Sequence, residues 1–418
     1  MKHSIYMVEF SIALVVLTGV YFLNIPSPSF HQDESQWIGS SYYFESFIQS
    51  PFDSSVWNKS YWTLTQPPLT RYTIAIGRLA GGYQTHELNV PWNGDVGRAE
   101  NEARGAIPDL DLLWWSRLPM ALLAAGSGLI FFLAAYIIGG RLTGFSALFF
   151  FVATPYLPRM LGRAMGETSL LFWTMLAASM AVVALYRCQQ RQGLWWLVGV
   201  GVCSGLAGSA KLNGIAAAGM AILLALFVFF KYRQALTEES KRFMTTAVLL
   251  APLITVLTFF LLNPFLYRQP INRLNEMWEH RIGAMQRQQI SSSDSAITNL
   301  ETRLQVLPQR IFVSYTPTQL EMPLFNILLT AVGLAYLVWL SKGWFAAGSV
   351  ALSETTALVA MSIALFMVLP PLGTPLDWDR YFLFPVIFNL LCTAVAISIV
   401  WRGLVHIFQH VLKTAHSN

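Results

Sequence analysis

The sequence predicts an all-α membrane protein that crosses the bilayer many times. Of its 418 residues, 55% are hydrophobic and only 12% are charged, whereas a soluble domain carries roughly 25% charged residues. Long apolar segments recur along the whole chain, and most approach the roughly 20 residues that a membrane-spanning helix needs. We therefore expect a single membrane domain over residues 1–418.

Ten apolar segments are predicted to span the membrane. The first follows Lys2 and lacks a clear small-residue cleavage site, so we interpret it as an uncleaved helix, with a signal peptide as the minor alternative. The ten predicted spans are 5–24, 112–139, 143–161, 168–187, 193–210, 212–231, 244–263, 322–340, 345–369 and 381–401.

One further segment, residues 67–82, decides the topology. It has only sixteen residues and carries Arg71 and Arg78. Loops rich in Lys and Arg favour the cytoplasmic side. The loop with Lys231 and Arg242 agrees with the other basic loops and with cytoplasmic termini only if 67–82 does not cross. We therefore predict an interfacial helix on the outer face with snorkelling arginines; a crossing would make it an eleventh span.

This topology places two long loops outside, 25–111 and 264–321. The first holds ten of the 22 acidic residues. In the second, apolar residues from Ile271 to Met285 recur at helical spacing, which indicates an amphipathic helix on the membrane surface. A weaker helix is predicted over roughly 296–307.

Two adjacent carboxylates, Asp33 and Glu34, directly follow the first span. Repulsion between neighbouring carboxylates tunes one of them towards general-base work near neutral pH. The alternative is a solvated acidic loop.

Further polar residues gather at helix ends on the same side of the predicted membrane. Ionisable groups at this depth are costly and usually functional. Separately, each has a plain alternative: a helix anchor, a structural ion pair, a snorkelling lysine or an ordinary turn. Together they suit an anionic substrate and a proton transfer. They are Arg117, Arg159, Arg163, Glu167, Lys211, Asp379, Arg380 and Tyr381, of which the 159, 163 and 167 positions would share one face if helical.

Five short motifs occur in a familiar order. They are HQDE at 31–34, QPPL at 66–69, SRLP at 116–119, GLAGSAKLNG at 205–214 and RYFLFP at 380–385. The series resembles the protein O-mannosyltransferases and aminoarabinose transferases, which share the C-type glycosyltransferase fold. Gln66 stands where that family has a histidine, and the connection through 83–111 is longer than in many relatives.

The resemblance implies a polyprenyl-phosphate monosaccharide donor that is used on the extracytoplasmic side. We expect transfer of the sugar to an acceptor hydroxyl on a protein or glycolipid, with inversion at the anomeric carbon. It implies that Asp33 is the catalytic base and that Glu34 helps to position the substrate. Arg117 would support the first loop. Lys211 and Arg380 would contact the lipid phosphate.

The remaining expectations concern cofactors, location and alternatives. Some relatives with this fold use a divalent metal, but the sequence has no dedicated metal cage, so we assign none. No nucleic-acid motif is present. We expect an integral protein of the plasma (inner) membrane, in contact with the lipid bilayer. The second hypothesis is a transporter or flippase of a lipid-linked anion, which the one-sided polar residues and the lack of a visible inverted repeat disfavour.

Overall fold

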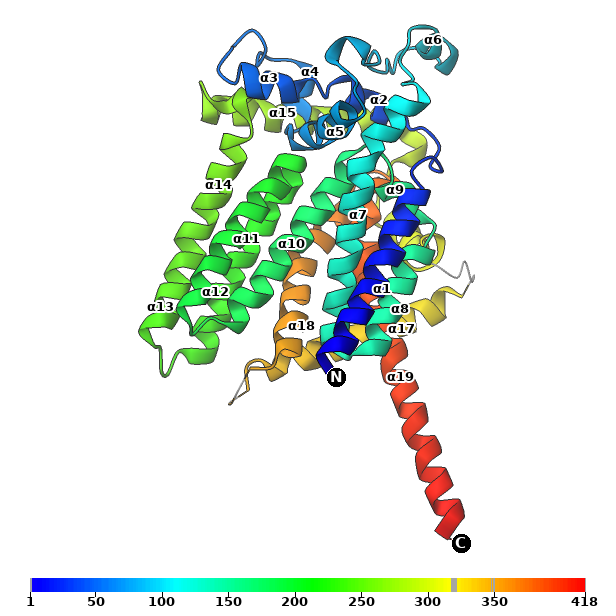
Figure 1. The fold of residues 1–418 in the computed structure, drawn as a ribbon, viewed down its shortest axis with the longest axis vertical. Coiled ribbons are helices and arrows are strands. Elements are labelled where there is room, and N and C mark those ends of the chain that lie inside the picture. The colour runs from blue at the N-terminus through cyan, green and yellow to red at the C-terminus, as the bar shows by residue number, and fades with distance from the viewer. Residues whose placement is uncertain (1, 317–321, 347, 349, 418) are drawn as a thin grey trace.

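The structure, a computed structural model, describes residues 2–316, 322–346, 348 and 350–417. It is a helical bundle covered at one end by short helices that lie across it (Figure 1). The described residues form helices and a single isolated β-bridge, which confirms the predicted all-α class. Residues 317–321, at the end of the predicted second loop, lie outside the described part.

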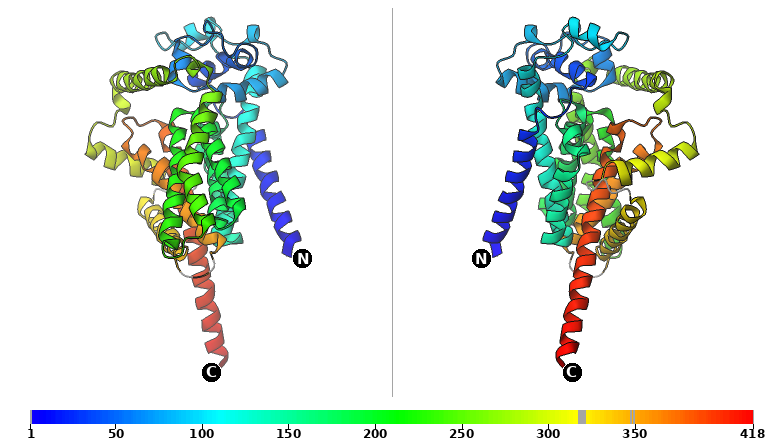
Figure 2. Two further views of the ribbon diagram at one scale, coloured as in Figure 1. Left: turned by 90° about the vertical axis from the view of Figure 1, so that its left-hand side faces the viewer. Right: turned by 90° about the vertical axis from the view of Figure 1, so that its right-hand side faces the viewer.

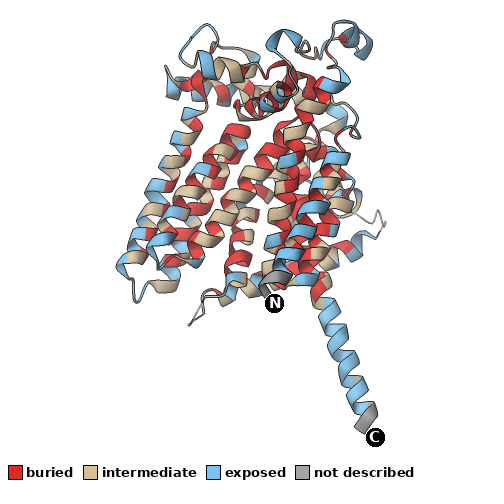
Figure 3. Cartoon of the chain, in the orientation of Figure 1, coloured by how far each residue is buried: buried red, intermediate tan, exposed pale blue. Residues whose placement is uncertain are grey.

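Nine helical segments of the described chain are long and apolar enough to cross a membrane. Their outward faces expose large apolar side chains, such as Val15 and Leu23 of α1, while the faces between neighbouring helices are buried (Figure 3). These segments contain α1 Lys2–Leu23, α7 Leu110–Gly139, α10 Gly166–Tyr186, α11 Arg191–Ala210, η2 Leu212–Ala218 with α12 Gly219–Tyr232, α13 Glu238–Thr245 with α14 Ala251–Leu261, α17 Pro323–Gly343, α18 Leu352–Ile363 and α19 Leu383–Ser417.

The predicted span 143–161 is divided into two short helices, α8 Arg141–Ala153 and α9 Tyr156–Leu161. Pro155 separates them, and the preceding Thr154 has an extended backbone. Proline disfavours the helical conformation in the residue before it. By length and composition α8 is only a shorter apolar helix, although it packs along α7 and α19 within the bundle.

A cap layer covers the end of the bundle opposite the two chain termini (Figures 1 and 2). It consists of α2 Gln32–Gly39, α3 Tyr43–Gln49, α4 Tyr61–Thr65, α5 Leu69–Ala80, α6 Arg98–Ala103 and α15 Pro270–Ser291. The predicted amphipathic helix is therefore α15, and the weaker helix predicted after it is α16 Leu300–Gln309.

Helix α5 occupies the segment whose crossing was in question. It has 12 residues, too few to span, and it packs on α7. A Cβ at Gly77 would collide with the carbonyl of Trp115, so glycine permits this close approach. The prediction that the two arginines snorkel is wrong: Arg71 and Arg78 are 3% and 0% exposed, because α2 and α3 cover them.

Candidate active site

A polar pocket of about 90 Å³ lies where the cap layer meets the bundle. Its walls come from α2, α4, α5, α10, the turn after α11, α15 and η9 Asp379–Phe382. Two carboxylates and four cations line it, which leaves an excess of two positive charges. These residues are Asp33, Glu167, Arg71, Lys211, Arg281 and Arg380.

The HQDE motif begins α2 and presents its acidic residues. The side chain of His31 accepts a hydrogen bond from the backbone N–H of Asp33 at 3.1 Å, and the Glu34 carboxylate accepts one from the backbone N–H of His31 at 3.0 Å. This reciprocal cap fixes the first turn. Successive helix residues point about 100° apart, so Asp33 and Glu34 enter different surroundings.

Glu34 forms a buried ion pair rather than part of the pocket wall. Its carboxylate accepts two hydrogen bonds of 2.7 Å from Arg117 and one of 2.9 Å from the backbone N–H of Ala164. Arg117 also donates to the carbonyl of Ile25 at 3.0 Å. The pair ties α2 to α7 and to the turn before α10.

Asp33 points into the polar pocket, where its carboxylate lies 2.7 Å from Arg380. Lys211 and Glu167 form a second pair in the same pocket, at 2.6 Å. The structure thus brings these four predicted residues together, although they come from four separate parts of the chain. Because Asp33 and Glu34 contact different arginines, attraction to those cations replaces the repulsion expected between the neighbouring carboxylates.

The other predicted residues surround the pocket without lining it. Asp379 accepts from Arg159 at 3.0 Å and from the hydroxyl of Tyr315. Tyr381 accepts from the pocket residue Arg281 at 3.4 Å. Arg163 is mostly buried; burial lowers the pKa of its guanidinium.

Positions 159, 163 and 167 do not lie on one continuous helix, so the condition for the face that they would share is not met. Helix α9 ends at Leu161 and α10 begins at Gly166. Arg163 lies in the intervening turn and belongs to neither helix. Two glycines, Gly162 and Gly166, lie at this break.

Sequence reasoning missed Arg71 and Arg281 as pocket residues. The Arg71 Nε donates to Ser40 at 2.8 Å, and its guanidinium lies 5.0 Å from the ring centre of Trp37. Burial lowers the pKa of Arg71 to about 10. Arg71 could have been found from its position just after the QPPL motif. Arg281 could have been found from its position on the polar face of α15.

An ion pair between Arg310, which the sequence analysis did not single out, and Asp377 supports the pocket without lining it. Arg310 donates two hydrogen bonds to Asp377, at 2.8 and 2.7 Å, and these raise the pKa of Arg310 well above its usual value. Backbone hydrogen bonds join the same segment to the second loop: Ile297 to Pro375 at 2.8 Å and Asp377 to Ser295 at 2.7 Å. These hydrogen bonds hold the residues that immediately precede Arg380.

The pocket does not fit a divalent cation. Among the described residues, no three His, Cys, Asp or Glu side chains are grouped as metal ligands. Both pocket carboxylates already contact a lysine or an arginine. Its excess of positive charge suits an anion instead.

Comparison with solved structures shows the C-type glycosyltransferase fold. The oligosaccharyltransferase AglB from Archaeoglobus fulgidus, solved with an inhibitory peptide and a dolichol-phosphate, matches with a TM-score of 0.55 and 13% identity over 99% of this chain and 52% of that one. ArnT from Cupriavidus metallidurans matches in its apo state with a TM-score of 0.54 and 15% identity, and bound to undecaprenyl phosphate with a TM-score of 0.51 and 16% identity. Both matches cover 95% of this chain and 60% of that one. The chain thus spans about half to three-fifths of these proteins.

Comparison with curated proteins gives no match. Residues 37–268, more than half of the chain, match the family model described as dolichyl-phosphate-mannose-protein mannosyltransferase. This segment includes α5, Arg117, Glu167 and Lys211. The chain therefore belongs to the dolichyl-phosphate-mannose-protein mannosyltransferase family, a family of glycosyltransferases.

Proposed function

We propose that the protein transfers a monosaccharide from a polyprenyl-phosphate donor to an acceptor hydroxyl, with inversion at the anomeric carbon. Family membership supports glycosyl transfer. The excess positive charge of the polar pocket supports a phosphate-bearing donor. The solved AglB and ArnT complexes with dolichol-phosphate and undecaprenyl phosphate support a lipid carrier.

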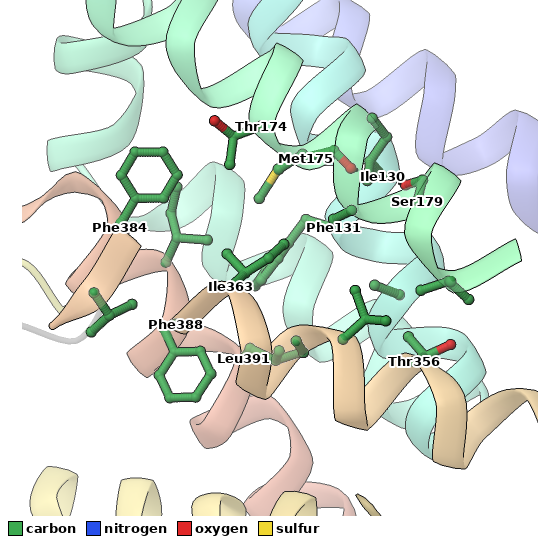
Figure 4. Close-up of a pocket in the computed structure, with 17 residues that line it drawn as sticks. Ile130, Phe131, Thr174, Met175, Ser179, Thr356, Ile363, Phe384, Phe388 and Leu391 are labelled. Atoms are coloured by element: carbon green, nitrogen blue, oxygen red, sulfur yellow. Dashed lines mark hydrogen bonds between the residues drawn. The ribbon is translucent and has the colours of Figure 1, made fainter. Parts of the chain in front are cut away.

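The observation that carries the proposal is an apolar cavity that shares helix α10 with the polar pocket. This cavity, of about 110 Å³, lies between α7, α10, α18 and α19 (Figure 4). Helix α10 supplies Glu167 to the polar pocket and Thr174 to the cavity, about 10 Å further along at 1.5 Å per residue. Arg380 precedes α19, whose Phe384 and Phe388 line the cavity.

This arrangement suits a ligand with a charged head and an apolar tail. The phosphate and sugar would occupy the polar pocket, and the proximal isoprene units would occupy the cavity. Because the tail leaves one apolar environment for another, the cavity would contribute orientation more than affinity. Orientation of the sugar against the acceptor is itself a large part of catalysis.

In the proposed reaction, Asp33 acts as the general base. Its carboxylate takes the proton of the acceptor hydroxyl while the hydroxyl oxygen bonds to the anomeric carbon. The bond from that carbon to the donor phosphate breaks, and its electron pair leaves with the phosphate. Arg380 orients Asp33 through their 2.7 Å contact, and the cations of the pocket stabilise the charge that develops on the leaving group.

The carboxylates that face the pocket support the proposed inversion. A retaining double displacement needs a nucleophile in addition to an acid or base. Both carboxylates contact a cation, but the Glu167 side chain is only 4% exposed and that of Asp33 is 24% exposed, so Asp33 is the one that an acceptor can reach. A single displacement by the acceptor then inverts the anomeric carbon.

We also propose that the pocket opens on the extracytoplasmic side of the plasma (inner) membrane. The basic loops support this orientation, with both termini cytoplasmic. In that orientation 25–111 and 264–321 are the extracytoplasmic loops that supply the cap layer. Acceptor recognition, whether of a protein or a glycolipid, then depends on these loops.

The test uses purified protein, polyprenyl-phosphate monosaccharides, and hydroxyl-bearing peptides and glycolipids as acceptors. The anomeric configuration of the product is read by NMR. We expect Asp33→Asn to lower turnover by about 10²–10⁴, the usual value of a general base, with donor binding retained. Asp53→Asn, a carboxylate outside the pocket that interacts with Ser55, is the matched control. Near-normal turnover in Asp33→Asn would refute the mechanism, and no transfer by the parent protein would refute the function.

A further inference from the structure

The four cations of the polar pocket are not equivalent. Arg380 and Lys211 each contact a carboxylate, Asp33 and Glu167. No described carboxylate lies within 4.0 Å of a side-chain nitrogen of Arg71, and the same holds for Arg281. The excess positive charge of the pocket therefore belongs to these two arginines, which come from α5 and α15.

Arg71 is the more unusual of the two because it is buried. A buried charge is costly unless it is paired, yet the neighbours of Arg71 are neutral. Ser40 accepts from its Nε and the carbonyl of Gln66 from its Nη1, at 2.8 and 3.0 Å. The rings of Trp37 and Trp62 flank the guanidinium at 5.0 and 5.9 Å. These neutral neighbours orient the guanidinium without neutralising its charge.

Arg281 lines the pocket from helix α15. Its guanidinium donates a long hydrogen bond of 3.4 Å to the Tyr381 hydroxyl, which is also neutral. Elsewhere on α15, Arg273 contacts Glu276 at 3.4 Å and lies outside the polar pocket. Of the three arginines of α15, Arg273 is ion-paired and Arg281 is not, so these two can be compared.

We propose that Arg71 and Arg281 form the clamp that binds the phosphate of the lipid-linked donor. This inference rests on the proposed function and specifies which residues hold its leaving group. It moves the phosphate contact away from Lys211 and Arg380, which the sequence favoured and which hold the carboxylates instead. The phosphate supplies the anion that the two arginines lack.

The charge of the clamp matches the product better than the substrate. The donor phosphate is a diester with one negative charge, whereas the released lipid phosphate is a monoester with about −1.5 to −2 near neutral pH. Two unpaired arginines therefore gain attraction as the bond to the sugar breaks. An interaction that strengthens in this way accelerates the reaction rather than only retaining the substrate.

The test measures binding of two lipids to the protein in nanodiscs, polyprenyl phosphate and the uncharged polyprenol of equal length. We expect the parent protein to prefer the phosphate. Arg71→Gln and Arg281→Gln should each weaken phosphate binding by roughly 10- to 100-fold, the range of a lost charge-assisted hydrogen bond, and leave polyprenol binding unchanged. Arg273→Gln is the matched control on α15 and should keep the preference.

A second comparison separates the clamp from the ion pairs. Lys211→Met should lower turnover while the preference for the phosphate remains. If Lys211→Met removes the preference and Arg281→Gln keeps it, the clamp is wrong. Monodisperse elution is required of every variant; if Arg71→Gln fails it, Arg281→Gln alone decides.

The failure of the clamp can be told apart from failure of the function. Sugar transfer by the parent protein with an unchanged lipid preference in Arg281→Gln would refute only the clamp. An absence of both transfer and phosphate preference in the parent protein would refute both. Equal losses in Arg273→Gln and Arg281→Gln would assign the effect to α15 as a whole and also refute the clamp.

Discussion

The buried pair of Glu34 and Arg117 should control the stability of the active site. Their side chains are 0% and 1% exposed. In Arg117→Met, the Glu34 carboxylate loses two hydrogen bonds and remains buried without a cation. Breaking such a pair costs about 3–5 kcal/mol, so we expect a strongly destabilised protein in which α2 no longer holds Asp33 in place.

The double variant Glu34→Gln with Arg117→Met should be less damaged than the sum of its single changes. It leaves no uncompensated charge, and replacement of a whole buried pair by neutral groups is often close to neutral. The two residues are in direct contact, so their effects should be non-additive by more than the 0.5 kcal/mol that separates coupled from independent sites.

The assay combines stability and function. Membrane proteins of this size rarely unfold in one reversible step, so the readout is the fraction that stays monodisperse after heating in detergent, together with turnover at a permissive temperature. Additive effects would refute the pairing. Complete loss of turnover in a double variant that is as stable as the parent protein would show that Glu34 takes part in the chemistry rather than in positioning.

Three further predictions concern topology, the ion pair of Arg310 and Asp377, and helix packing. With the native cysteines replaced, a cysteine at Gln84 should react with an impermeant thiol reagent in intact cells and one at Gln234 only after permeabilisation; the reverse pattern would invert the proposed orientation. Asp377→Asn should lower turnover by roughly tenfold through the loss of charged hydrogen bonds to Arg310. An unchanged rate would show that the pair of Arg310 and Asp377 does not support catalysis. Gly333→Ala should lower thermal stability, because its Cβ would collide with the backbone of α19, whereas Gly19→Ala has open space and should be tolerated; similar melting of the two variants would refute the packing.

The polar pocket shows what a sequence can predict about a membrane site. Asp33, Lys211 and Arg380 lie far apart in the chain, yet counting spans from the basic loops placed them on one side. The argument succeeded because the bilayer allows a helix end only two positions. It could not predict which cation contacts which carboxylate, since pairing depends on side-chain distances.

Burial of the α5 arginines was outside the reach of the sequence. An arginine in a short apolar helix at a membrane surface usually extends to water. Arg71 and Arg78 do not, because α2 and α3 fold over α5 and supply Ser40, Ser41 and Glu45 as partners. Those contacts join residues more than thirty positions apart, and no local pattern announces them.

The position of Arg380 connects the second loop to the chemistry proposed in the first. Asp377 and Asp379 both precede Arg380, and each is held by a different part of the protein: Asp377 by Arg310 after α16, and Asp379 by Arg159 of α9. Two anchored residues fix the backbone that leads into Arg380, and so help to hold its guanidinium against Asp33. A displacement of α16 would therefore be transmitted through Asp377 to the base, which makes the second loop a part of the active site although only α15 contacts the pocket directly.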